Sequence, residues 1–190
     1  DLTIVFLYSY LLGSIPFGLI ITKIFLNEDV RKIGSGNIGA TNVLRAGNKK
    51  LAILTLLLDV VKGYVVIIFS LRFFNEYIYL SALTCFLGHI FPVWLKFKGG
   101  KGVSTYLGII LGLSLNLALI FILSWLIILL VFKYSSFSSI VSVGIVFIYS
   151  LSLDETYLSF YLFFVAIIIA FTHRENIKRL KDKSENKIKF

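Results

Sequence analysis

Six long apolar runs leave this chain of 190 residues little choice of environment. They cover residues 2–26, 51–74, 77–95, 103–132, 137–153 and 157–172. A run of about 20 apolar residues is long enough to cross the hydrocarbon core of a bilayer as a helix. With 58% hydrophobic residues, 15% charged residues and a mean hydropathy of +0.91, the composition excludes an ordinary soluble domain. The sequence therefore predicts an all-α integral membrane protein.

The fourth run determines the number of spans. As one helix its 30 residues would extend about 45 Å, whereas the hydrocarbon core is about 30 Å thick. A break near Gly112–Asn116 gives seven spans and places every lysine and arginine except Lys62 and Arg72 at one membrane face. The positive-inside rule makes that face cytoplasmic. We predict seven transmembrane helices in a single membrane-embedded domain, residues 1–190, with the N-terminus outside and the C-terminus in the cytoplasm.

Three polar segments lie at the predicted cytoplasmic ends of these spans. They are the first glycine segment GSGNIGATNVLR (Gly34–Arg45), the second glycine segment KFKGGKG (Lys96–Gly102) and the HREN segment (His173–Asn176). Glycine turns present backbone N–H groups that bind phosphate, and nearby lysine and arginine strengthen such a site. We expect all three segments to meet in one site for a phosphorylated lipid precursor.

Two nucleotide-binding motifs are excluded by their context. Gly34, Gly36 and Gly39 match G-x-G-x-x-G, but an apolar span precedes them and another follows, so the parallel sheet of a dinucleotide-binding fold cannot form. The sequence around Lys101 also fails as a P-loop, because a glycine follows the lysine. No nucleotide cofactor is expected.

Three strings together resemble a known family: GSGNIGATNVLR, then GHIFPVWLKFKGGKGV (Gly88–Val103), then HRENIKRL (His173–Leu180). They are similar to the signature segments of the PlsY family, the bacterial acyl-phosphate:glycerol-3-phosphate acyltransferases, and LDVVKG (Leu58–Gly63) resembles a further family segment. The resemblance implies a multi-pass enzyme of the bacterial inner membrane, with its active site on the cytoplasmic side. It would transfer a fatty acyl group from acyl phosphate to the 1-hydroxyl of sn-glycerol 3-phosphate in phospholipid biosynthesis.

The implied products are lysophosphatidate, which is 1-acyl-glycerol 3-phosphate, and inorganic phosphate. The implied partners are acyl phosphate, glycerol 3-phosphate and membrane lipids, without nucleic acid, cofactor or metal. Acyl-chain preference and oligomeric state stay open.

Each substrate contains a phosphate, so the site needs two anion-binding positions. Arg45 is suited to a bidentate contact and Lys101 to a point-charge contact. The backbone N–H groups of Gly99–Gly102 are expected to converge on a phosphate at the start of the fourth helix. The predicted catalytic residues are Ser35, Arg45, Lys101, His173 and Asn176, and the predicted substrate-binding residues are Gly34, Gly36, Asn37, Thr41, Asn42, His89, Lys98, Gly99, Gly100 and Gly102. Which segment binds which phosphate is left open.

The proton acceptor has two candidate types. The His-x-x-x-x-Asp dyad of other acyltransferases is absent, because Trp94 and Lys178 stand where its aspartate would be. We prefer a substrate-assisted step, in which the donor phosphate accepts the proton, over His89 as general base. His173 is the only other imidazole.

Asp59 and Lys62 lie three residues apart inside the second span, where unpaired charge is costly. They are expected to form an ion pair that supports the site, and direct contact with substrate is the alternative. The alternative function is an organophosphate transporter or small anion channel. Transporters usually contain repeated halves, and the two glycine segments are not repeats of each other. A structural subunit of a lipid-synthesis assembly would leave all three polar segments unexplained.

Overall fold

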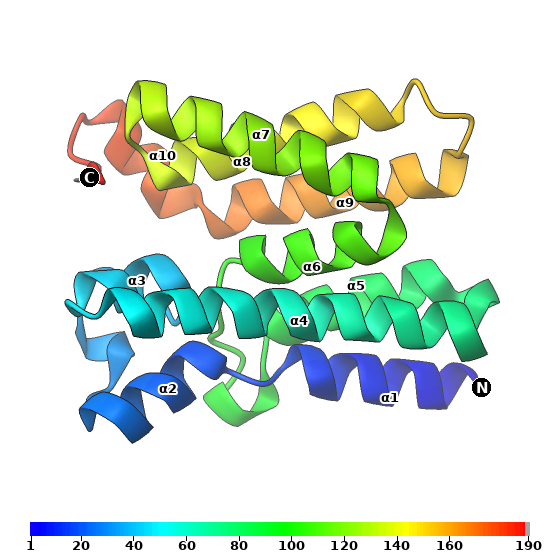
Figure 1. The fold of residues 1–190 in the computed structure, drawn as a ribbon, viewed down its shortest axis with the longest axis horizontal. Coiled ribbons are helices and arrows are strands. Elements are labelled where there is room, and N and C mark those ends of the chain that lie inside the picture. The colour runs from blue at the N-terminus through cyan, green and yellow to red at the C-terminus, as the bar shows by residue number, and fades with distance from the viewer. Residues whose placement is uncertain (189–190) are drawn as a thin grey trace. The chain divides into compact units, whose positions relative to one another are not determined.

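The structure, a computed structural model, describes residues 1–188, and within them all regular secondary structure is helical. Contacts divide the chain into two compact units, residues 1–113 and the part from Ser114 onward. The predicted all-α class is confirmed, whereas the single domain stays a prediction. The first unit consists of α1 (Leu2–Gly13), α2 (Phe17–Leu26), α3 (Ala40–Arg45), α4 (Lys49–Phe73), α5 (Ile78–Ile90) and α6 (Val103–Leu113) (Figure 1).

Helices of the first unit pack closely because glycines lie at their contacts. Gly13 brings α1 against α5, where an added methyl group would lie 2.1 Å from the carbonyl oxygen of Cys85. Gly108 likewise allows α6 to pack against α4, because a methyl group added there would lie 1.9 Å from the carbonyl oxygen of Val60. Small residues at helix contacts are typical of membrane proteins, where close packing replaces the hydrophobic effect between helices.

The polar side chains in the middle of α4 are buried, whereas many of its apolar side chains are exposed. Asp59, Lys62 and Ser70 are buried, while Val61 and Val65 are 49% and 46% exposed. This is the reverse of a helix on the surface of a soluble protein. A lipid environment explains the arrangement, because exposed apolar side chains contact acyl chains there without cost.

Four segments of the described chain are long and apolar enough to cross a membrane: Leu2–Leu26, Lys49–Phe73, Asn75–Leu95 and Leu115–Phe132. A fifth results if Thr156–Thr172 and Arg174–Lys181, which meet at a bend of 60°, are one span. Val103–Leu113 and Ser135–Ser150 are shorter apolar helices. The structure thus confirms a helical membrane protein, and the count of seven spans stays a prediction.

The structure has the one helix break predicted from the sequence and two further breaks next to prolines. The predicted break in the fourth run is confirmed at Ser114, between α6 and α7 (Leu115–Phe132), and the first run is interrupted before Pro16. The third run was expected to be helical to Leu95, but α5 ends at Ile90. Pro92 explains the difference, since a proline disfavours helical geometry at the residue before it and lacks an N–H donor.

The second unit contains α7, α8 (Ser135–Ser150), α9 (Thr156–Thr172) and α10 (Arg174–Lys181). The α8 helix contacts α7, α9 and α10. After α10 the chain returns to the start of α8, where the N–H of Ile188 donates to the carbonyl of Lys133 at 2.8 Å. The segment after α10 is therefore attached to the second unit.

Candidate active site

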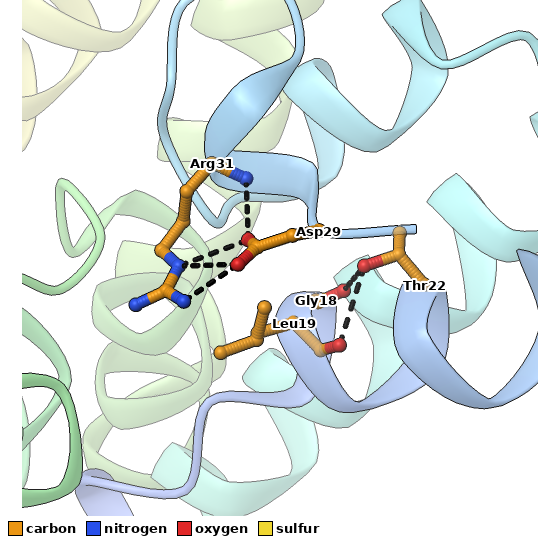
Figure 2. A network of polar contacts seen from close by, with 5 residues as sticks. All are labelled: Gly18, Leu19, Thr22, Asp29 and Arg31. Atoms are coloured by element: carbon orange, nitrogen blue, oxygen red, sulfur yellow. Dashed lines mark hydrogen bonds and ion pairs between the residues drawn. The ribbon is translucent and has the colours of Figure 1, made fainter. Parts of the chain in front are cut away.

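The turn before the first glycine segment is fixed by an ion pair. Figure 2 shows the Arg31 guanidinium facing the Asp29 carboxylate, with N–O distances from 2.6 to 3.2 Å. Hydrogen bonds from Arg31 hold the pKa of Asp29 well below its usual range, and the same contact raises the pKa of Arg31. In the preceding α2, the Thr22 hydroxyl donates to the carbonyls of Gly18 and Leu19 (Figure 2). Arg31 is therefore neutralised within the fold.

Asn42 organises the first glycine segment from the inside. Its side chain is buried, and its Nδ2 lies 2.8–2.9 Å from the carbonyl oxygens of Val30, Ile33 and Asn37. Its Oδ1 accepts from the backbone N–H of Ser35 at 2.9 Å and from the Ser35 hydroxyl at 3.2 Å. The polar atoms of Asn42 therefore position the segment, and its predicted contact with substrate stays a prediction.

The outer side of this segment presents Ser35 and Arg45. Gly34 and Gly36 have positive φ angles of 54° and 70°, which glycine adopts at little cost. A methyl group on Gly34 would lie 2.5 Å from the Oδ1 of Asn42 and 3.1 Å from the Cδ of Arg45, so the arginine stem passes directly over this glycine. Ser35 and Arg45 are exposed. Within residues 1–188 the Arg45 guanidinium forms no ion pair or hydrogen bond, unlike that of Arg31.

Two other predicted residues of the segment are partly buried. The Oδ1 of Asn37 accepts from the N–H of Gly39 at 2.9 Å, which tightens the turn before α3. Thr41 lies in the first turn of α3.

The second glycine segment folds back over the end of α5. The N–H of Gly99 donates to the carbonyl of Ile90 at 2.9 Å, and that of Gly100 to the carbonyl of His89 at 3.1 Å. The expectation that all backbone N–H groups of Gly99–Gly102 converge on a ligand is therefore wrong for these two. The N–H groups that lack an intrahelical acceptor belong to the first turn of α6, which begins at Val103 after Gly102.

The backbone at the start of the second glycine segment is strained. Lys96 and Phe97 have φ angles of 52° and 61°, a left-handed conformation that costs a non-glycine residue about 1–3 kcal/mol. Hydrogen bonds from the N–H groups of Phe97 and Lys98 to the carbonyls of Pro92 and Leu95 stabilise it. Lys98 is exposed and Lys101 is partly buried.

An apolar cluster supports both glycine segments in the first unit. Its buried members are Leu19, Val30, Ile38, Val43 and Ala52, and Leu95 packs against it. Ile38 and Val43 belong to the first glycine segment, while Leu95 directly precedes the second. One cluster therefore holds the two segments in the same region of the first unit.

A buried polar group lies below the second glycine segment. The predicted ion pair between Asp59 and Lys62 is confirmed, with 2.7 Å between Oδ1 and Nζ. The same Nζ lies 2.9 Å from the Nδ1 of His89 and 2.9 Å from the carbonyl oxygen of Ile15. A methyl group on Gly100 would lie 2.0 Å from the Nε2 of His89. Sequence spacing indicated the ion pair, but not that His89 joins it.

The HREN segment lies at the bend between α9 and α10. His173 is the residue between the two helices and is buried, and its Nδ1 lies 2.8 Å from the carbonyl oxygen of Ile169. The Nδ2 of Asn176 donates to Glu185 at 2.7 Å. His173 therefore lies at the bend itself, and Asn176 lies in the first part of α10.

Glu185 is a residue that the sequence did not single out. Its carboxylate is buried and accepts from the Ser136 hydroxyl at 2.9 Å, from Asn176 and from the Arg179 guanidinium at 2.7 Å. Burial opposes ionisation, but the hydrogen bonds from Asn176, Arg179 and Ser136 outweigh it and lower the pKa of Glu185. No local motif marks a glutamate in a basic tail as buried.

Glu185→Ala should lower the apparent Tm by roughly 3–10 °C, because hydrogen bonds to a charged group contribute about 1.5–3 kcal/mol. The folded-state pKa lies below the ordinary value of 4.5, so this stabilisation is present above pH 4.5 and is lost as the pH falls through the folded-state pKa. Thermal unfolding in detergent at pH 7 and at pH 4 measures the effect. Glu175→Ala, an exposed glutamate in α10, is the matched control. A difference between wild type and Glu185→Ala that did not shrink at pH 4 would contradict this role.

The helices and the segments between them define an integral membrane protein with two glycine-rich segments. Residues 3–183 match the family model of glycerol-3-phosphate acyltransferase. The chain is 54% identical over 186 residues to the glycerol-3-phosphate acyltransferase of Pelagibacter ubique (strain HTCC1062), a match that covers 98% of this chain and 97% of that protein.

Two solved structures are similar over almost the whole chain. One is PlsY (YgiH), an integral membrane glycerol 3-phosphate acyltransferase, in its glycerol 3-phosphate form, with a TM-score of 0.94, 36% identity and coverage of 99% of this chain and 96% of that one. The other is the lysphosphatidic acid form, with a TM-score of 0.91, 36% identity and coverage of 99% and 95%. The chain belongs to the glycerol-3-phosphate acyltransferase family, and it is an acyltransferase of phospholipid synthesis. The resemblance noted in the sequence is thereby confirmed.

Proposed function

We propose that this acyltransferase uses acyl phosphate as donor and the 1-hydroxyl of sn-glycerol 3-phosphate as acceptor, and releases lysophosphatidate and phosphate. The observation that most supports a phosphate-bearing substrate is Arg45. This residue is exposed, its stem passes over Gly34, and its guanidinium has no ion-pair or hydrogen-bond partner within residues 1–188. The glycerol 3-phosphate and lysphosphatidic acid forms of PlsY support the same acceptor and product for this chain.

Within this proposal, Arg45 and Lys101 bind phosphate oxygens and reduce the negative charge that develops on the leaving group. The Ser35 hydroxyl, oriented by Asn42, adds a neutral contact at the same segment. The first turn of α6 supplies backbone N–H groups and the positive end of the helix dipole. His173 and Asn176, in the second unit, stay predicted catalytic residues. The remaining predicted substrate-binding residues shape the two glycine segments around these groups.

The reaction needs one bond formed, one bond broken and one proton moved. The 1-hydroxyl oxygen of glycerol 3-phosphate attacks the acyl carbonyl carbon, and the bond from that carbon to the bridging oxygen breaks. The hydroxyl proton passes to the departing phosphate in the substrate-assisted form, or to a histidine in the alternative form. The protein then acts mainly by holding both substrates in line and by neutralising charge.

The location of the enzyme is part of the proposal. Seven spans with the N-terminus outside and the C-terminus in the cytoplasm place both glycine segments and the HREN segment at the cytoplasmic face of the bacterial inner membrane. The alternation of basic and acidic connections along the sequence supports this topology. Cys85, the one cysteine, is buried, so single cysteines introduced at Glu76 and Lys183 are suitable for labelling from opposite sides.

The donor is tested with purified protein and glycerol 3-phosphate, supplied in turn with palmitoyl phosphate, palmitoyl-CoA or palmitoyl-acyl carrier protein. We expect lysophosphatidate by mass spectrometry with palmitoyl phosphate alone, because the proposed site consists of compact phosphate-binding segments. Comparable turnover with either thioester would overturn the donor assignment.

The reaction should also continue in the presence of a chelator. Loss of activity in the chelator, with restoration by magnesium, would contradict a metal-free mechanism.

A further inference from the structure

The buried polar group beneath the second glycine segment contains a hydrogen-bond arrangement that determines where one proton lies. The Nζ of Lys62 contacts three atoms of the first unit. They are the carbonyl oxygen of Ile15 at 2.9 Å, the Oδ1 of Asp59 at 2.7 Å and the Nδ1 of His89 at 2.9 Å. All three side chains are buried, with side-chain exposures of 3% for Lys62, 1% for Asp59 and 4% for His89.

The direction of the contact between Lys62 and His89 follows from the chemistry of an ammonium group. An ammonium ion has three hydrogens and no lone pair, so it donates to every partner and accepts from none. The Nδ1 of His89 must therefore be the acceptor. Asp59 does not compete for a proton on that nitrogen, because its Oδ1 is 3.7 Å from Nδ1, beyond hydrogen-bond distance.

We propose that Lys62 is a positioning residue that holds His89 in the neutral tautomer with its hydrogen on Nε2. His89 is then an N–H donor and has no lone pair available on the side that faces the second glycine segment. Gly100 lies directly against that nitrogen, since a methyl group there would be 2.0 Å from Nε2. Within residues 1–188 the ring has no hydrogen-bond or ion-pair partner other than Lys62 and Asp59, both at Nδ1.

The ligand chemistry follows from the proposed function, on which this step rests. An N–H group beneath a glycine turn flanked by Lys98 and Lys101 is suited to an oxygen of a phosphate group. His89 accordingly donates a hydrogen bond to a phosphate oxygen. It is not the general base of the reaction, because its Nδ1 lone pair already accepts a hydrogen bond from the Lys62 ammonium group.

His173 has the opposite arrangement in the second unit. Its Nδ1 lies 2.8 Å from the carbonyl oxygen of Ile169, and a carbonyl only accepts, so Nδ1 has the hydrogen. In a neutral His173 the lone pair is then on Nε2.

The two tautomers are tested by NMR on protein labelled with ¹⁵N-histidine in detergent or nanodiscs, without substrate. The chain contains two histidines, so His173→Gln leaves the signals of His89 alone. We expect a protonated Nε2 and an unprotonated Nδ1 for His89, and the reverse for His173 in the wild type. A protonated Nδ1 on His89, or a ring protonated at both nitrogens, would overturn the proposal even if no variant of Lys62 can be purified.

Lys62→Met tests the cause, with Lys50→Met at the exposed start of α4 as the matched control. The His89 signals should change to a mixture of tautomers in Lys62→Met and stay unchanged in Lys50→Met. Unchanged tautomer signals in Lys62→Met would overturn the role of Lys62.

Steady-state kinetics distinguish a hydrogen-bond donor from a general base at His89. Gln places an amide N–H near the position of Nε2, so His89→Gln should retain at least about tenfold more kcat/KM than His89→Leu, which lacks any donor. Equal losses in both variants would contradict the donor role. The NMR result does not depend on turnover. If the expected tautomers were found but the protein did not transfer acyl groups, only the proposed function would be contradicted. If the protein transferred acyl groups but His89 had its hydrogen on Nδ1, only this inference would be contradicted.

Discussion

Gly100→Ala should reduce kcat/KM for acyl transfer by at least about a hundredfold, which is the loss that a displacement of roughly 1 Å causes in a positioned site. The variant removes no charge and no hydrogen-bonding group. Its methyl group would lie 2.0 Å from the Nε2 and 2.8 Å from the Cε1 of His89, so the turn, the ring or both must move. Steady-state rates of lysophosphatidate formation measure the effect, and size-exclusion chromatography checks that the variant is monodisperse.

Gly144→Ala is the matched control for this glycine. No heavy atom lies within 4 Å of its added methyl group, and it lies inside α8 with ordinary helical geometry. Its kinetics should equal those of the wild type. Near-normal turnover in Gly100→Ala would mean that the second glycine segment is only a connection between helices.

Arg45→Ala should lower kcat/KM by roughly 10- to 150-fold, because a charge-assisted contact to phosphate contributes about 1.5–3 kcal/mol. The contact exists in the ground state and in the transition state, so we expect a higher KM for a phosphorylated substrate together with a lower kcat. Lys101→Ala should behave similarly. Arg45→Lys should recover only part of the loss, because an ammonium group lacks the planar pair of donors.

Arg72→Ala is the control for Arg45→Ala. Arg72 lies near the opposite end of α4 from Lys49, with its guanidinium 5.9 Å from the centre of the Phe73 ring. Its removal should leave the kinetics of acyl transfer unchanged. If Arg45→Ala unfolded the protein, Arg45 would have a structural role. If both variants had wild-type kinetics, Arg45 would have no role in acyl transfer.

Features with a short sequence range were predictable. The helical class follows from the apolar runs, the break at Ser114 from the length of the fourth run, and the pairing of Asp59 with Lys62 from a spacing of three residues on one helix. Each of these depends on one helix or on one run of residues, so periodicity and length are sufficient.

Features that depend on contacts between distant residues were not predictable. A single helix over residues 77–95 would place His89 about 10 Å from Lys96, but α5 ends at Ile90 and the second glycine segment returns over it. The same return places the N–H groups of Gly99 and Gly100 on carbonyls of α5. Motif reasoning placed Asn42 with the substrate contacts, although its polar atoms are all engaged inside the segment. An asparagine has the same appearance in a motif whether it points inward or outward.

The most direct test of the account is an isotope experiment on acyl transfer itself. Palmitoyl phosphate labelled with ¹⁸O at the bridging oxygen is incubated with purified protein and unlabelled glycerol 3-phosphate, and both products are measured by mass spectrometry. Attack at the acyl carbon leaves the bridging oxygen with phosphorus, so we expect labelled phosphate and unlabelled lysophosphatidate in equal amounts. Unlabelled phosphate, or labelled phosphate without lysophosphatidate, would contradict the claim that this enzyme transfers an acyl group from acyl phosphate to glycerol 3-phosphate.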